Sequence, residues 1–109
     1  MKQKSPFELA SDLQGQVRRI VSAFDVDSLP AAERTLLLLL RRLATDVRLD
    51  IRAYGTAETA AEQQRLAREM RERLKQLDEA ILQAGSLNLM GAADVAQLSA
   101  TTQQLMSDL

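Results

Sequence analysis

The chain of 109 residues contains neither cysteine nor histidine. Without cysteine it can form no disulfide, no thiolate metal ligand and no thiol nucleophile. Without histidine it lacks the commonest general base and the commonest transition-metal ligand. No glycine-rich phosphate loop and no nucleophile–base motif replaces them. We therefore expect a protein that is not an enzyme and that holds no metal ion, no cofactor and no small-molecule substrate.

Aromatic residues make up only 3% of the sequence, and there are only four glycines and two prolines. The apolar fraction is still 46%, so the core must consist of leucine, alanine, valine and isoleucine. Long stretches without glycine or proline favour helices over the strands and turns of a β-sandwich. A chain of this length is expected to form one domain with a modest core. We predict a single all-α domain over residues 1–109.

Neither sign of charge dominates, because 14 basic and 15 acidic residues give a net charge of −1. This balance argues against a protein that binds nucleic acid through bulk positive charge, although it allows a local basic patch. The five leucines at 36–40 are far fewer than the roughly 20 apolar residues that cross a bilayer. No apolar segment follows Lys2 and Lys4, as it would in a secretory signal. We expect a cytoplasmic protein with no membrane contact.

Two acidic pairs resemble parts of metal sites, but each lacks the rest of the site. Asp25 and Asp27 begin like a calcium loop, yet the glycine and the final glutamate of such a loop are missing. Glu58 and Glu62 are four residues apart, as in di-iron bundles, but those bundles also require histidine. We interpret both pairs as acidic residues that favour helix N-termini.

Start and stop signals locate the first two helices. Ser5, Pro6 and Glu8 form a capping box with proline at the first helical position. Apolar residues then recur at intervals of three and four, which predicts an amphipathic helix over about 6–24. Pro30 fits the first turn of a second helix, and Gly55 is expected to end it. The second helix should therefore cover about 30–54.

The third and fourth helices are predicted in the same way. Thr56 or Thr59 can cap the third helix, and Gly85 is expected to end it, which gives about 57–84. Its outer face carries opposite charges four residues apart, so its arginines should be solvated: Arg68, Arg71 and Arg73. The fourth helix should cover about 89–107. It is intrinsically the weakest, since it includes Gly91 and several serines and threonines.

Four amphipathic helices joined by short turns favour antiparallel neighbours. We predict a four-helix up-down antiparallel bundle with a long hairpin of the second and third helices; exchange of the first and fourth helices between two subunits is an alternative. This hairpin should project roughly 10 Å beyond the shorter helices, at 1.5 Å per residue, and expose Ile51, Tyr54, Ala57 and Ala60. The positions expected to be buried are Leu13, Val17, Leu40, Leu43, Met70, Leu74, Leu77, Leu98 and Leu105.

The leucines at 36–40 cannot all face one core, because successive helical residues are about 100° apart. We expect the bundle to cover four of them, including Leu39, and to leave Leu38 pointing outward. The same side of the helix carries Thr45, Leu49 and a row of arginines that spans roughly 27 Å: Arg34, Arg41, Arg48 and Arg52. Two exposed leucines with no role would be one explanation of this face.

Apolar residues bordered by arginine are typical of protein interfaces. We therefore predict a non-enzymatic protein–protein interaction module, such as a small adaptor, assembly factor or subunit, which forms a homodimer or binds a protein partner. The predicted contact residues are Leu38, Arg41, Thr45, Leu49, Arg52 and Tyr54. The alternative is a small regulator that contacts nucleic acid through the arginine row. We rank it second because no basic tail or aromatic stacking residue accompanies the row, and Asp46 and Asp50 lie on the same helix.

Overall fold

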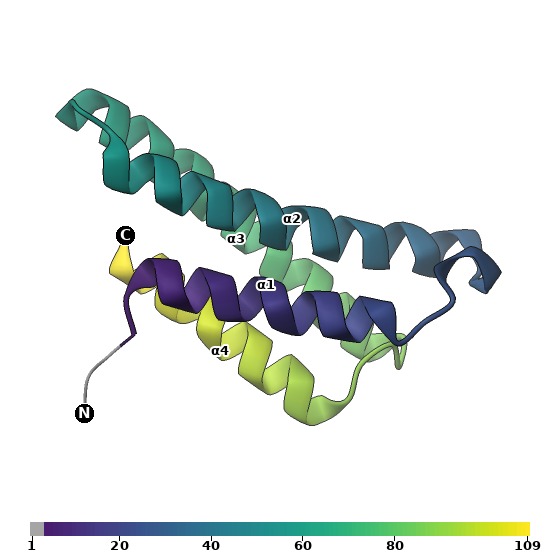
Figure 1. The fold of residues 1–109 in the computed structure, drawn as a ribbon. Helices are drawn as coiled ribbons and strands as arrows, with labels where there is room; N and C mark the ends of the chain where they lie inside the picture. Colours follow the sequence, from purple (N-terminus) through teal and green to yellow (C-terminus); the bar gives the residue numbers. More distant parts are fainter. Residues whose placement is uncertain (1–3) are drawn as a thin grey trace.

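The computed structural model describes residues 4–109, which form an all-α bundle of four helices (Figure 1). The helices are α1 (Pro6–Ser22), α2 (Ala31–Thr56), α3 (Ala60–Ser86) and α4 (Ala92–Asp108), and a short 3₁₀ helix, η1 (Val26–Ser28), precedes α2. No strand occurs among the described residues. The fold class predicted from the sequence is confirmed.

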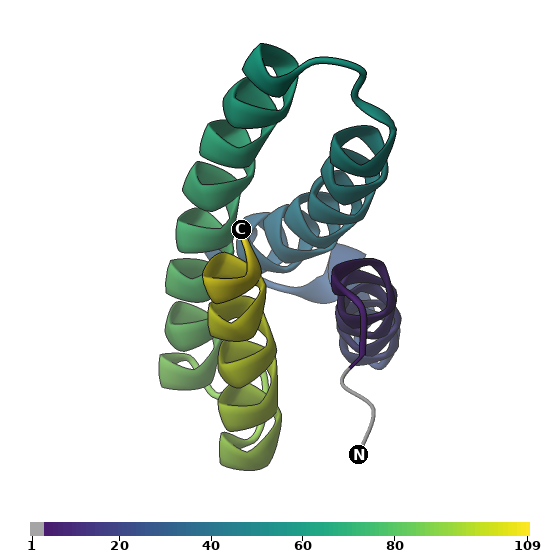
Figure 2. The same cartoon turned by 90° about the vertical axis from the view of Figure 1, so that its left-hand side faces the viewer.

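The four helices form a closed ring of neighbours within one chain. α1 packs against α2, α2 against α3, α3 against α4, and α4 against α1. Because α2 and α3 are longer than the other two helices, the α2–α3 hairpin extends past them at the end where α1 begins and α4 ends (Figures 1 and 2). The result is an elongated molecule of 46 × 32 × 19 Å.

All four helices contribute to one aliphatic core, and the nine positions predicted to be buried are indeed buried. Each large side chain that is removed from water in this way contributes about 1.5–3 kcal/mol. The expectation of an exposed hairpin tip is wrong for Ile51, which is 6% exposed, and is met in full only by Ala60, because Tyr54 and Ala57 are half-buried. Ile51 lies more than one turn before the end of α2 and belongs to the core cluster, against which Tyr54 also packs.

The helix starts depend on side-chain caps. Ser5 Oγ accepts a hydrogen bond from the Glu8 N–H of α1 at 3.2 Å. Thr59 Oγ1 accepts one from the Glu62 N–H at 3.1 Å, so Thr59 is the N-cap of α3. Thr56 instead remains inside α2, where its hydroxyl donates to main-chain carbonyls of the last turn.

Neither Gly55 nor Gly85 ends a helix, which corrects two predicted boundaries. α2 continues to Thr56 and α3 to Ser86. The left-handed residue after α3 is Asn88, with φ of 60°, a conformation that asparagine tolerates better than most residues. Gly85 has a packing role, since a Cβ atom there would lie 2.7 Å from Val95 Cγ2 of α4. α4 starts at Ala92, after Gly91 as its N-cap residue, three residues later than predicted.

The leucines at 36–40 divide differently from the prediction. Leu36, Leu37 and Leu40 are buried, whereas Leu38 is 38% exposed and Leu39 is 40% exposed. The expectation for Leu39 is wrong because the buried arc of α2 is displaced toward α1: it includes Leu37 and stops about 40° short of Leu39, at 100° per residue. Even with these leucines, none of the helices among residues 4–109 is long and apolar enough to cross a membrane.

Candidate functional site

Five of the six predicted contact residues lie on one side of α2, within about 80° of each other at 100° per residue. We call this surface the α2 outer face: Leu38, Arg41, Thr45, Leu49 and Arg52. All except Thr45 are exposed, and Leu49 is 57% exposed. Leu38 and Leu49 are roughly 16 Å apart along the helix. The face therefore presents two apolar side chains on a rigid support, with arginines between and beside them.

The first half of the α2 outer face borders a shallow hollow of about 400 Å³ between α1 and α2. Leu38 and Thr45 contribute to it, and the other lining residues are charged: Arg18, Arg41, Arg42 and Asp46. Arg42 and Asp46 are paired at 3.9 Å across one turn of the exposed helix surface. With three arginines and one aspartate, the hollow is positively charged.

Thr45 is held in place by α1. The Gln14 side chain donates from Nε2 to Thr45 Oγ1 at 3.0 Å, and its Oε1 accepts from Arg48 Nη1 at 2.8 Å. The Thr45 hydroxyl in turn donates to the Arg41 carbonyl at 3.0 Å. Gln14 itself is only 6% exposed. Thr45 therefore offers a partner little more than its methyl group.

Arg48 is also engaged within the chain, which shortens the predicted arginine row. Besides its bond to Gln14, its guanidinium lies 5.6 Å from the centroid of the Phe7 ring, a cation–π distance. Arg34, Arg41 and Arg52 remain from the row. Three separate arginines follow a phosphate backbone less well than four, so this geometry weakens the nucleic-acid hypothesis.

The sequence interpretation missed Gln14, although the sequence contains a signal for it. Ala10, Gln14, Val17 and Val21 recur at intervals of four, three and four, and all four are buried on α1. A glutamine inside such a stripe predicts a polar contact across a helix interface, because a buried amide needs hydrogen-bond partners.

Asp50 and Arg73 form a second polar contact that the sequence interpretation missed. Arg73 of α3 donates to Asp50 of α2, and this hydrogen bond raises the pKa of Arg73. Arg73 is therefore only partly solvated, contrary to the prediction. Asp50 faces α3, and so it does not neutralise the arginines of the α2 outer face.

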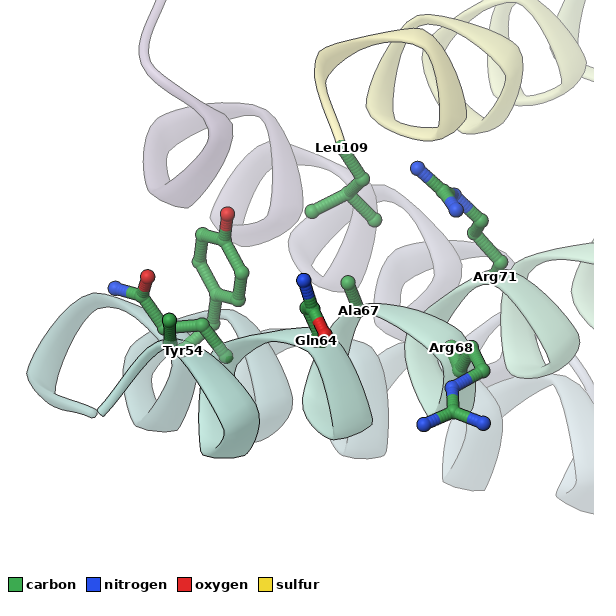
Figure 3. Close-up of a pocket in the computed structure, with 8 residues that line it drawn as sticks. Tyr54, Gln64, Ala67, Arg68, Arg71 and Leu109 are labelled. Atoms are coloured by element: carbon green, nitrogen blue, oxygen red, sulfur yellow. The ribbon is translucent and has the colours of Figure 1, made fainter. Parts of the chain in front are cut away.

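Tyr54, the sixth predicted contact residue, lies elsewhere. It is about 160° from Leu38 around α2, at 100° per residue, and lines a groove of about 430 Å³ beside the end of α4 (Figure 3). We call this the hairpin-tip groove: Tyr54, Ala60, Gln63, Gln64, Ala67, Arg68, Arg71 and Leu109. The structure thus separates the predicted contact residues into two surfaces.

Among residues 4–109, no three histidine, cysteine, aspartate or glutamate side chains are grouped so that they could hold a metal ion. In comparisons with known proteins, no family model matches the chain, and no curated protein or solved structure matches it significantly. The function has to be inferred from the surfaces of the chain itself.

Proposed function

We propose that this chain is a non-enzymatic protein–protein interaction module, a small adaptor, assembly factor or subunit, that binds through the α2 outer face. The supporting observation is that Leu38 and Leu49 are exposed on the same side of α2, whereas the opposite side of that helix is buried in the core. Exposed apolar groups with arginine beside them are typical of binding surfaces.

The apolar surface of Leu38 and Leu49 is small, so an interface there also needs polar contacts. Leu38 and Leu49 together expose about as much side chain as one fully exposed leucine, so covering both contributes about 1.5–3 kcal/mol. Association costs at least about 4 kcal/mol in lost translational and rotational freedom. The leucines alone do not hold a complex together, and the partner must also pair with Arg41 and Arg52.

A second copy of the chain is one candidate partner, as the sequence predicts. A two-fold axis that sets Leu38 opposite Leu49 of the second copy also brings Arg41 near Arg48, and Arg34 near Arg52, along one edge. Like charges in these positions oppose association. An acidic surface of another protein pairs with the same arginines without this cost, and so it is the second candidate partner.

The test compares Leu38→Glu/Leu49→Glu with Leu39→Glu. Leu39 is a matched control, because it is equally exposed on the same helix but lies about 100° away from Leu38. We expect the double variant to lose association, measured as mass by light scattering and as partner capture from native lysate, while circular dichroism stays helical. Leu39→Glu should keep both. The proposal fails if wild type is monomeric at high micromolar concentration and captures nothing that depends on Leu38 and Leu49.

The second candidate function, contact with nucleic acid, has its own measurement. Binding through Arg34, Arg41 and Arg52 should weaken steeply with salt, with a slope of log K against log salt near −3 for three phosphates at about −0.9 each. Association that depends on Leu38 and Leu49 but shows no such slope supports the protein partner.

A further inference from the structure

The hairpin-tip groove lies where α4 stops but α3 continues. Leu109, after the end of α4, lines the groove together with Ala67 and Arg71 of α3 (Figure 3). α3 begins at Ala60, roughly 10 Å further on at 1.5 Å per residue. The first two turns of α3, from Ala60 to about Ala67, therefore extend past the end of α4.

The lining of the groove combines small, apolar and polar groups. Ala60 and Ala67 lie one above the other on α3, where their small side chains allow another helix to approach closely. Tyr54 and Leu109 provide apolar surface, and Leu109 lies across from Ala67 (Figure 3). Beside these, amide groups of Gln63 can donate and accept hydrogen bonds.

Both charged side chains that line the groove are arginines, Arg68 and Arg71. Within residues 4–109 neither forms an ion pair, whereas the neighbouring Arg65 pairs with Glu69 at 3.3 Å and Arg73 pairs with Asp50. Figure 3 shows Arg71 beside Leu109, whereas the Arg68 side chain points away from Leu109. The groove thus presents two unpaired positive charges, three residues apart, at the edge of a small-residue surface.

We propose that the hairpin-tip groove binds an acidic amphipathic helix of a partner protein. The apolar or small side chains of that helix pack on Ala60, Ala67 and Tyr54, and carboxylates three or four residues apart pair with Arg68 and Arg71. About seven residues, or two turns, match the uncovered stretch from Ala60 to Ala67 at 1.5 Å per residue, and Arg71 lies at the end of that stretch, beside Leu109 (Figure 3). This surface is separate from the α2 outer face, so the inference goes beyond the proposed function.

A second copy of the chain fits the groove less well. The only α-helix among residues 4–109 with acidic and no basic residues is α4. Its two carboxylates, Asp94 and Asp108, are roughly 21 Å apart, which is too far to pair with Arg68 and Arg71 together. Asp94 also accepts a hydrogen bond from Gln16 at 3.5 Å.

The probe for the test is a fluorescent synthetic helical peptide of 14 residues, with leucine and alanine on one face and glutamates flanking that face. The control peptide has lysine in place of every glutamate. We expect fluorescence anisotropy with the full chain to show saturable binding of the glutamate peptide, weakened by salt, and at least about tenfold weaker binding of the lysine peptide.

Matched variants locate the binding. Arg68→Glu/Arg71→Glu should weaken binding of the glutamate peptide about tenfold. Arg65→Glu, at a residue that lies about 160° from Ala67 around the same helix at 100° per residue, should change it less than about twofold. Leu38→Glu/Leu49→Glu should leave peptide binding unchanged, which separates this proposal from the one for the α2 outer face.

Several results would overturn the proposal. These are no saturable binding up to about 1 mM peptide, equal binding of the lysine peptide, or equal losses with Arg65→Glu and Arg68→Glu/Arg71→Glu. Loss of binding in Leu38→Glu/Leu49→Glu would move the peptide to the α2 outer face. A doubled mass that is reversed by Arg68→Glu/Arg71→Glu would make a second copy the occupant.

Discussion

Replacing Gly85 by alanine tests the close packing of α3 on α4. Inside a helix, alanine is favoured over glycine by about 1 kcal/mol, so the substitution should stabilise the protein if space is available. At Gly85 there is no space for a side chain, because the new Cβ atom would lie 2.7 Å from Val95 Cγ2 and 3.7 Å from Val95 Cγ1. Valine is stiff about χ1 in a helix and cannot easily turn aside. Overpacking of this kind costs about 1–3 kcal/mol.

The expected net effect of Gly85→Ala is a loss of about 0–2 kcal/mol in the free energy of unfolding. Gly15→Ala is the matched control, since Gly15 lies inside α1 with no atom within 4 Å of an added Cβ. It should stabilise the protein by about 0.5–1 kcal/mol. Urea denaturation followed by circular dichroism measures both values on one scale, and they should have opposite signs.

A double-mutant cycle assigns the loss to one contact. In a Val95→Ala background the two methyl groups are gone, so Gly85→Ala should there be as favourable as Gly15→Ala. The coupling between the two positions should be about 1–3 kcal/mol. If Gly85→Ala stabilises the protein equally with Val95 present, α3 and α4 do not approach each other as described, and the reasoning is refuted.

Three further substitutions test the core and the contacts between helices. Leu43→Ala, at a side chain that is 5% exposed, should cost about 2–5 kcal/mol in urea denaturation, and an effect within error would mean that another face of α2 is buried. Arg73→Ala should cost more than Arg68→Ala, about 1 kcal/mol against less than about 0.5 kcal/mol, because only Arg73 is paired with a carboxylate of another helix. The pKa of Arg73 is raised, so the guanidinium keeps its charge at every pH below the ordinary guanidine pKa and loses it only above the raised value. The difference in stability between Arg73→Ala and Arg68→Ala should therefore stay the same from pH 6 to about pH 10. Gln14→Ala should cost about 1–3 kcal/mol through its bonds to Thr45 and Arg48, and equal stability of Gln14→Ala and wild type would show that those bonds are replaced by water.

The apolar spacing was enough to predict the fold class and the core. Within each helix, apolar residues recur at intervals of three and four. Leu13, Leu40 and Leu74 each belong to such a stripe on their own helix, and the stripe indicates which side of that helix is buried. The capping residues Ser5 and Thr59 act within four residues of the chain, so they too could be identified, although Thr56 was an equal candidate.

The features that could not be predicted from the sequence are contacts between helices that are far apart in the chain. Gly85 was interpreted as a stop signal because its packing against Val95 is invisible without α4 in place. The expectation for Leu39 failed for the same reason, since the stripe does not say on which side of α2 the first helix lies. The candidate surfaces were predicted in part, because exposure of Leu38 and Leu49 follows from the stripe alone. The separation of Tyr54 from them also follows from the spacing of 100° per residue, but the groove that Tyr54 lines could be found only with the end of α4 in place.

The uncovered start of α3 also has a consequence for local motion. Its first turns are supported by the Thr59 cap and by Leu66, which is buried but does not belong to the main core cluster. Opening these turns exposes little apolar surface, so it costs only a small part of the global unfolding free energy. Their amide hydrogens should therefore exchange much faster than those around Leu74. A helix bound in the groove would slow that exchange, and part of its binding energy would be spent on ordering the segment that holds it.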